Sequence, residues 1–147
     1  MQPLPDHSSA PALELEFRLQ ASPDAVFGFL ADMQQFAAVH PVISRIEARG
    51  GDRYQVYETL QAGFIPVSFS YPATVSADRA ARTVVMHATV MRVTHIEMQF
   101  EVTGTPGGAI VRERIRFRTP LPIRGLMRRT FRRLHGELFS AIGQAAG

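Results

Sequence analysis

Apolar and polar residues alternate along most of the chain, and this alternation predicts a protein built mainly from β-strands. In residues 13–20, leucine and phenylalanine at the odd positions alternate with charged or amide side chains. Such a period of two is typical of a strand with one buried and one exposed face. The same pattern returns in residues 42–49, 54–60, 65–75, 84–90, 94–102 and 109–118. The sequence therefore predicts seven strands.

Two regions depart from the alternation and indicate helices. Ser22-Pro23-Asp24 provides a helix cap, a proline suited to the first helical position and an acid near the positive helix end. Short helices should follow and end before Pro41. Beyond the prolines at 120 and 122, apolar residues at 127, 131, 134, 138 and 142 have helical spacing. We therefore expect two short helices after the first strand and a long amphipathic helix at the C-terminus.

Turn signals separate most of the strands, at residues 50–52, 63 and 104–108. Residues 82–102 contain neither glycine nor proline, although this stretch is far longer than a usual strand of about 5–6 residues. A loop of odd length keeps the apolar residues before and after it on one face of the sheet. The simplest expectation is a turn at Met91-Arg92-Val93.

This order of elements resembles the START and polyketide cyclase superfamily (SRPBCC), which includes the birch-pollen-allergen type. The resemblance covers the chain from about residue 12. The segments that carry it are Ser22–Phe27, His40-Pro41, Gly107-Gly108 and Pro120–Pro122.

The resemblance implies an α+β helix-grip fold. Its curved, seven-stranded antiparallel sheet has the order 2-3-4-5-6-7-1 and wraps around a long C-terminal helix, which encloses a hydrophobic pocket. Members bind lipids, quinones, hormones or polyketides, and a few catalyse cyclisation or dehydration. They share no catalytic motif, so the resemblance identifies no catalytic residue here.

Composition narrows the possibilities further. At 147 residues the chain is expected to form one domain, residues 12–147, after a flexible tail of residues 1–11. It has no cysteine, which excludes disulfides and thiolate sites. No secretory signal and no apolar run of roughly 18 residues is present. We therefore expect a cytoplasmic protein, and nothing in the sequence calls for a cofactor.

Two acids fall on the apolar face of predicted strands. Glu58 and Glu113 each interrupt a row of inward-facing apolar residues. A buried carboxylate is costly unless it is paired, hydrogen-bonded or neutralised, so either acid is a candidate for ligand contact or for catalysis as a general acid/base. The alternative is that each acid reaches water at a sheet end or pairs locally.

The expected register suggests partners for one acid only. Ser44 should lie opposite Glu58, and Arg92 should approach the same row from its loop. Glu113 should face Met98, which offers no counter-charge. The remaining predicted ligand contacts are Tyr71, Met98 and Phe131. His40 is expected at the pocket mouth, where it contacts a ligand or caps the helix end. The histidines show no metal-binding spacing, so no metal site is predicted.

All sixteen basic residues are arginine, and the net charge is only +3. Arg112, Arg114, Arg116 and Arg118 form a row on the outer sheet face, where Glu14, Glu16 and Glu97 should pair with them. This pairing argues against a nucleic-acid partner. Arg128, Arg129, Arg132 and Arg133 have fewer acids nearby. They form either a solvated helix face or a weak contact with an anionic membrane or a ligand head group.

The sequence thus predicts binding or transport of a hydrophobic small molecule, such as a lipid, a quinone or a polyketide-like compound, in an internal cavity. One alternative is an enzyme of the polyketide cyclase or dehydratase kind that uses a cavity carboxylate. Another is an interaction module that uses the arginine-rich helix. The oligomeric state is left open.

Overall fold

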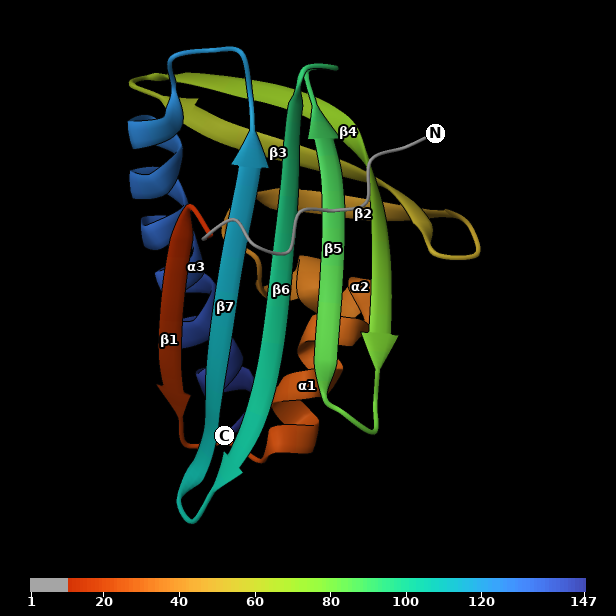
Figure 1. The fold of residues 1–147 in the computed structure, drawn as a ribbon, viewed down its shortest axis with the longest axis vertical. Helices are drawn as coiled ribbons and strands as arrows, with labels where there is room; N and C mark the ends of the chain where they lie inside the picture. The colour runs from red at the N-terminus through yellow and green to blue at the C-terminus, as the bar shows by residue number, and fades with distance from the viewer. Residues whose placement is uncertain (1–10) are drawn as a thin grey trace.

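The computed structural model describes residues 11–147, so the tail predicted for residues 1–11 lies almost wholly outside the described residues. Seven strands and three helices follow the predicted order (Figure 1). The elements are β1 (Leu13–Leu19), α1 (Pro23–Ala31), α2 (Met33–Val39), β2 (Ile43–Gly50), β3 (Arg53–Ala62), β4 (Ile65–Asp78), β5 (Thr83–Val90), β6 (Thr94–Thr105), β7 (Gly108–Arg118) and α3 (Arg124–Ala146).

The strands form one antiparallel sheet in the order β1-β7-β6-β5-β4-β3-β2, which confirms the predicted order. The sheet curves, and the helices lie on its concave side (Figure 1). Alternation along β7 is nearly perfect, because residues 109, 111, 113, 115 and 117 are buried while their neighbours face outward. The fold is therefore the predicted helix-grip.

The short helices begin at side-chain caps. The Ala25 N–H donates to the Ser22 hydroxyl at 3.2 Å, as the Ser-Pro-Asp sequence predicts. Asp32 caps α2 by accepting from the N–H groups of Gln34 at 2.9 Å and Gln35 at 3.2 Å. This second cap separates α1 from α2 and places both helices across one part of the sheet.

Two of the turns have special backbone geometry. The turn after β5 comprises residues 91–93, as predicted, and Met91 and Arg92 adopt positive φ angles of 54° and 65° in place of glycine. Gly108 begins β7 where the chain passes very close to the end of β1. A Cβ atom at Gly108 would lie 2.0 Å from the Leu19 carbonyl oxygen, so only glycine fits.

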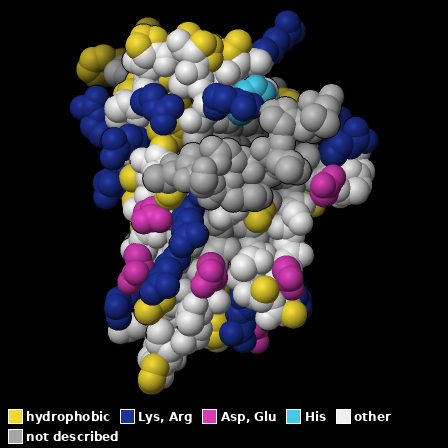
Figure 2. All heavy atoms as spheres, in the orientation of Figure 1, with side chains coloured by type: hydrophobic (Ala, Val, Ile, Leu, Met, Phe, Trp, Pro, Cys, Tyr) yellow, Lys and Arg dark blue, Asp and Glu magenta, His cyan; other side chains and the backbone are white. Residues whose placement is uncertain are grey.

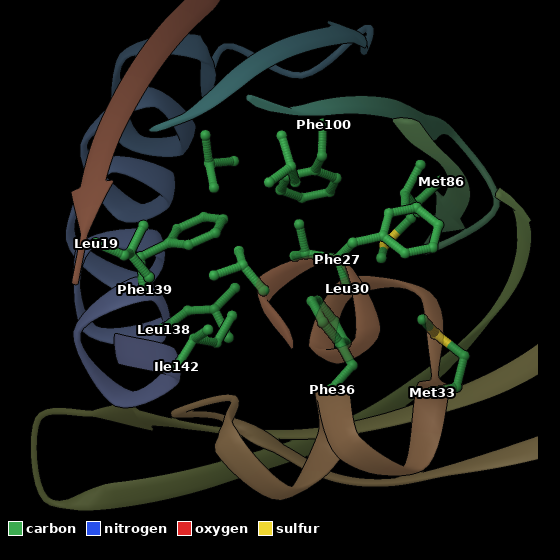
Figure 3. Close-up of a cluster of buried hydrophobic side chains, with 14 of the residues drawn as sticks. Leu19, Phe27, Leu30, Met33, Phe36, Met86, Phe100, Leu138, Phe139 and Ile142 are labelled. Atoms are coloured by element: carbon green, nitrogen blue, oxygen red, sulfur yellow. The ribbon is translucent and has the colours of Figure 1, made fainter. Parts of the chain in front are cut away.

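A cluster of fully buried side chains lies where α1 and the C-terminal half of α3 meet the sheet. Phe27 and Leu30 from α1 contact a cluster that includes Phe100 of β6 and Leu138 of α3 (Figure 3). These side chains are at most 1% exposed. None of the helices in residues 11–147 has the length and hydrophobicity that a membrane-spanning segment needs.

Candidate ligand-binding cavity

A cavity of about 220 Å³ lies between the concave face of the sheet and the N-terminal half of α3. Strands β2 to β6, the helix α2 and the residue His40 complete its wall. Most lining residues are aliphatic or aromatic, and they include Met98 of β6 and Phe131 of α3, both predicted ligand contacts. The polar side chains in the wall are His40, Tyr54, Glu58, Tyr71, Thr130 and His135.

Glu58 and Tyr71 form one polar pair in this wall. They lie diagonally across β3 and β4, because Tyr71 is the register partner of Val56, two residues before Glu58. The Tyr71 hydroxyl donates a short hydrogen bond to Oε1 of Glu58. Burial raises the pKa of the Glu58 carboxyl, and the bond from Tyr71 opposes that rise only in part. Burial and the adjacent carboxylate raise the pKa of Tyr71 well above its usual value.

Glu113 and His135 form a second, more deeply buried pair. Glu113 is 0% exposed and His135 is 3% exposed, and 2.7 Å separates Oε1 of the acid from Nδ1 of the ring. The other carboxylate oxygen, Oε2, has no hydrogen-bond partner among residues 11–147. Only His135 of the pair lines the cavity. Because its Nδ1 is occupied by Glu113, Nε2 is the nitrogen left for a ligand.

This second pair corrects one expectation. The residue opposite Glu113 on β6 is Phe100, not Met98, so the expected register is wrong by two residues. Glu113 does have a hydrogen-bond partner, which comes from α3 instead of a neighbouring strand. His135 lies between the apolar helix positions 134 and 138, and a histidine within such a stripe is the signal that would have suggested a buried acid opposite it.

His40 lines the cavity with a fixed orientation. Its Nδ1 accepts hydrogen bonds from the N–H groups of Val42 and Ile43, each at 3.3 Å. Burial, followed by the proximity of His135, lowers the pKa of His40 to about 3. The ring is therefore neutral at ordinary pH, with its proton on Nε2. The rings of His40 and His135 meet edge to face, with centroids 6.2 Å apart.

Besides Glu113, two further predicted contacts, Ser44 and Arg92, lie away from the cavity. A β-bulge between Ile43 and Arg45 shifts the register, so Ile43 faces Glu58 and the expected pairing of Ser44 with Glu58 is wrong. Ser44 is exposed and donates to the Tyr57 carbonyl oxygen at 3.2 Å. The expected approach of Arg92 to Glu58 is also wrong. Glu58 pairs with Phe69 of β4, whereas Arg92 is exposed in the turn after β5.

The arginine row on the outer face of β7 pairs largely as expected. Arg112 lies 3.6 Å from Glu16, and Arg114 lies 3.5 Å from Glu14. Glu97 contacts Arg116 at 3.4 Å, which corrects the expected pairing of Glu97 with Arg114. Within residues 11–147, no three histidine or acidic side chains are grouped closely enough to hold a metal ion.

A curved antiparallel sheet that holds a C-terminal helix over an apolar cavity defines the helix-grip class of proteins. The profile of the family described as polyketide cyclase / dehydrase and lipid transport matches residues 11–146. The chain belongs to this family. A search of curated protein sequences finds no match.

Solved structures with this fold have very different sequences. Ara h 8.0201 is 16% identical with a TM-score of 0.74, and the match covers 91% of this chain and 95% of that one. A START superfamily protein from Mycobacterium smegmatis is 14% identical with a TM-score of 0.74 and the same coverage. The Zhui aromatase/cyclase from Streptomyces sp. R1128 is 16% identical with a TM-score of 0.65, covering 91% and 92%. At such identities the likeness establishes the fold alone.

Proposed function

We propose that this protein binds or transports a hydrophobic small molecule in the cavity between the sheet and α3, in the cytoplasm as the sequence predicts. The observation that carries the proposal is the cavity itself, whose wall is apolar except for a few polar side chains. This combination is typical of small-molecule sites, in which apolar contact provides affinity and isolated polar groups provide orientation. A lipid, a quinone or a polyketide-like compound has the matching chemistry.

The size of the cavity favours a ligand, or part of a ligand, of one or two rings. An apolar cavity of about 150 Å³ is large enough to remain dry and bind benzene. The present cavity of about 220 Å³ is larger. A longer acyl or isoprenoid chain would extend out through the opening beside Leu126, which lines the cavity and is 57% exposed.

The polar groups of the wall would hold a polar atom of the ligand. His40 offers an N–H donor at Nε2, and His135 offers Nε2, the ring nitrogen that is not bonded to Glu113. Glu58 offers its second carboxylate oxygen, since Oε1 is engaged by Tyr71. A ketone, enol or phenol on an otherwise apolar skeleton fits these donors and acceptors.

The test is binding of N-phenyl-1-naphthylamine, a neutral dye that fluoresces in apolar surroundings. Ala88→Phe fills the cavity from the inner face of β5, whereas Thr89→Phe adds the same side chain to the outer face. We expect the first variant to reduce the affinity at least tenfold and the second to leave it unchanged. Equal affinity in both variants would contradict the proposed cavity site. Native mass spectrometry of the purified protein would identify a copurifying ligand.

Glu58→Leu tests the role of the first polar pair. We expect a native ligand that bears a polar group to bind more weakly, while N-phenyl-1-naphthylamine, which relies on apolar contact, is retained. Unchanged affinity for the native ligand would remove Glu58 from the site.

A second candidate function, proton transfer to or from the bound molecule, is favoured by the Glu113–His135 pair. A carboxylate at 2.7 Å from Nδ1 fixes the orientation of the ring and leaves Nε2 as the nitrogen that can accept a proton, which is the arrangement that a general base needs. The candidate acid/base is therefore His135, with Glu113 as its positioning residue. In this candidate function the carboxylate positions the base, whereas the enzyme considered from the sequence uses a cavity carboxylate as the acid/base itself.

5-Nitrobenzisoxazole provides a test, because a base removes its ring C–H proton, the electron pair breaks the N–O bond, and a coloured cyanophenolate is released. We expect turnover to be lost in His135→Gln and its pH profile to shift in Glu113→Gln. A rate equal to that of free imidazole at the same concentration would contradict this candidate.

A further inference from the structure

Large apolar side chains are exposed at one end of the molecule. Phe64 is fully exposed at the tip of the β3–β4 hairpin, beside Ile65. Met91 and Val93 are exposed in the β5–β6 turn, and Leu121 and Leu126 are exposed where β7 leads into α3. These six residues are called the apolar rim. They come from three separate parts of the sequence, yet the three connections all lie at the upper end of the molecule in Figure 1.

The apolar rim adjoins the cavity. Leu126 belongs to both the rim and the cavity wall. Leu60 and Val90 line the cavity at the ends of β3 and β5, directly before the two connections that carry the other rim residues. A ligand that enters or leaves the cavity beside Leu126 would therefore pass the exposed apolar side chains.

Charge around the rim has one sign. Residues 59–77 contain no charged side chain, and Arg92 is the charged residue of the β5–β6 turn. Residues 119–136 contain no acid, and they carry the five arginines Arg124, Arg128, Arg129, Arg132 and Arg133. In Figure 2, arginine and apolar side chains occupy the upper end of the visible face, and acidic side chains appear only farther down.

These arginines differ from those on the outer face of the sheet. Arg112 and Arg114 are paired with acids of β1. Arg128, Arg129, Arg132 and Arg133 are exposed and form no ion pair with any residue in 11–147. Their positive charge is therefore available to an external partner.

We propose that the apolar rim and these arginines dock onto an anionic lipid bilayer, with the cavity mouth facing the membrane. Apolar loop tips can enter the boundary between headgroups and acyl chains, while guanidinium groups bind lipid phosphates in the headgroup layer. A second copy of the chain is a poorer occupant, because two rims in contact would bring the two arginine clusters together. Exposed apolar patches of this kind mark interaction sites.

This docking gives the cavity a source of ligand. An apolar molecule dissolved in the bilayer could pass into the cavity without crossing water, and this part of the inference rests on the proposed function. The docking itself does not, because it depends on the rim and the arginines alone.

The chain has no tryptophan, so a single introduced tryptophan reports on one position. Phe64→Trp places the reporter at the hairpin tip. Thr103→Trp places it on an exposed site near the β6–β7 turn, at the opposite end of the molecule. The vesicles contain about 70% phosphatidylcholine and about 30% phosphatidylglycerol. We expect a blue shift of tryptophan fluorescence on adding them to the Phe64→Trp variant and no shift for the Thr103→Trp variant. No shift at 64, or equal shifts at both sites, would overturn the proposal. A shift at 64 that grows with protein concentration without vesicles would also overturn it, in favour of self-association.

The charge requirement is tested by vesicle sedimentation. Arg128→Gln/Arg132→Gln removes two unpaired arginines, and Arg112→Gln/Arg114→Gln removes two paired ones with the same change in net charge. The first variant should need about thirtyfold more anionic lipid for half-maximal binding, and the second should change little. Equal effects in the two variants, or equal binding to pure phosphatidylcholine, would contradict docking through this surface. Binding of N-phenyl-1-naphthylamine is measured on the same variants without vesicles. This control distinguishes a loss of membrane docking from a loss of ligand binding in the cavity.

Discussion

The two halves of the space between the sheet and α3 are built differently. In the half covered by α1, side chains from α1, β6 and α3 fill the space, and Leu138 is 0% exposed (Figure 3). In the other half, the same sheet and the same helix enclose a cavity with polar side chains in its wall. The comparison indicates that the packed half provides most of the stability, while the hollow half gives up packing for a site.

The largest effect should come from breaking the buried pair at the boundary of the two halves. His135→Leu leaves the carboxylate of Glu113 buried without a partner. We expect the free energy of unfolding at pH 7 to fall by about 3–5 kcal/mol, measured by urea denaturation. The double variant Glu113→Leu/His135→Leu removes both polar groups and should recover most of this loss. A small loss in the single variant, comparable to that of a surface substitution, would show that the pair is not energetically coupled.

The next largest effect on the free energy of unfolding should distinguish two leucines of α3. Leu138→Ala opens a void in the packed half and should lower the free energy of unfolding by about 3 kcal/mol. Leu126→Ala removes the same atoms from an exposed position at the cavity mouth and should change it by no more than about 0.5 kcal/mol. Thermal and urea denaturation of both variants test the contrast. Similar losses would mean that the mouth is packed as tightly as the core.

A smaller effect should appear only in acid. The pKa of His40 is about 3 in the folded protein and about 6.5 in the unfolded chain. Between these two pH values the unfolded chain binds a proton at His40 and the folded protein does not. Stability is therefore lost as the pH falls through this window. His40→Asn keeps an acceptor for the N–H groups of Val42 and Ile43 but cannot titrate.

At pH 5 the free energy of unfolding of the wild type should be lowered by about 2 kcal/mol through His40, and the asparagine variant should not show this loss. At pH 8 the two proteins should not differ in this way. Because His135 and Glu58 also face this region, the comparison is made between two proteins that retain both groups. Parallel stability curves for the two proteins over this range would exclude the effect.

The overall fold was predictable because it depends on patterns within short segments. Alternation gave the strands, Ser22 and Pro23 gave the start of α1, and the odd-length rule located the turn at 91–93. The site was only partly predictable. Glu58 and Glu113 were found because a carboxylate on an apolar face breaks the alternation, and Tyr71, Met98, Phe131 and His40 do line the cavity.

The missed features depend on how distant segments are placed relative to one another. The bulge after Ile43 moved Ser44 to the surface, and nothing in the local alternation revealed the extra residue. The partner of Glu113 comes from α3, and strand periodicity cannot fix the rotation of a helix over the sheet. The apolar rim became visible only when three separate connections were brought to one end.

The hydrogen bonds that hold the His40 ring have a consequence for selectivity. Because the backbone at the start of β2 fixes the ring, no conformational freedom remains to be lost when a ligand accepts from its Nε2. A hydrocarbon of the same shape would leave that N–H without an acceptor in an apolar wall. A site that loses a hydrogen bond in this way discriminates more strongly than one that loses a methylene contact. Among compounds of equal size, the cavity should therefore select the one with a carbonyl at that point.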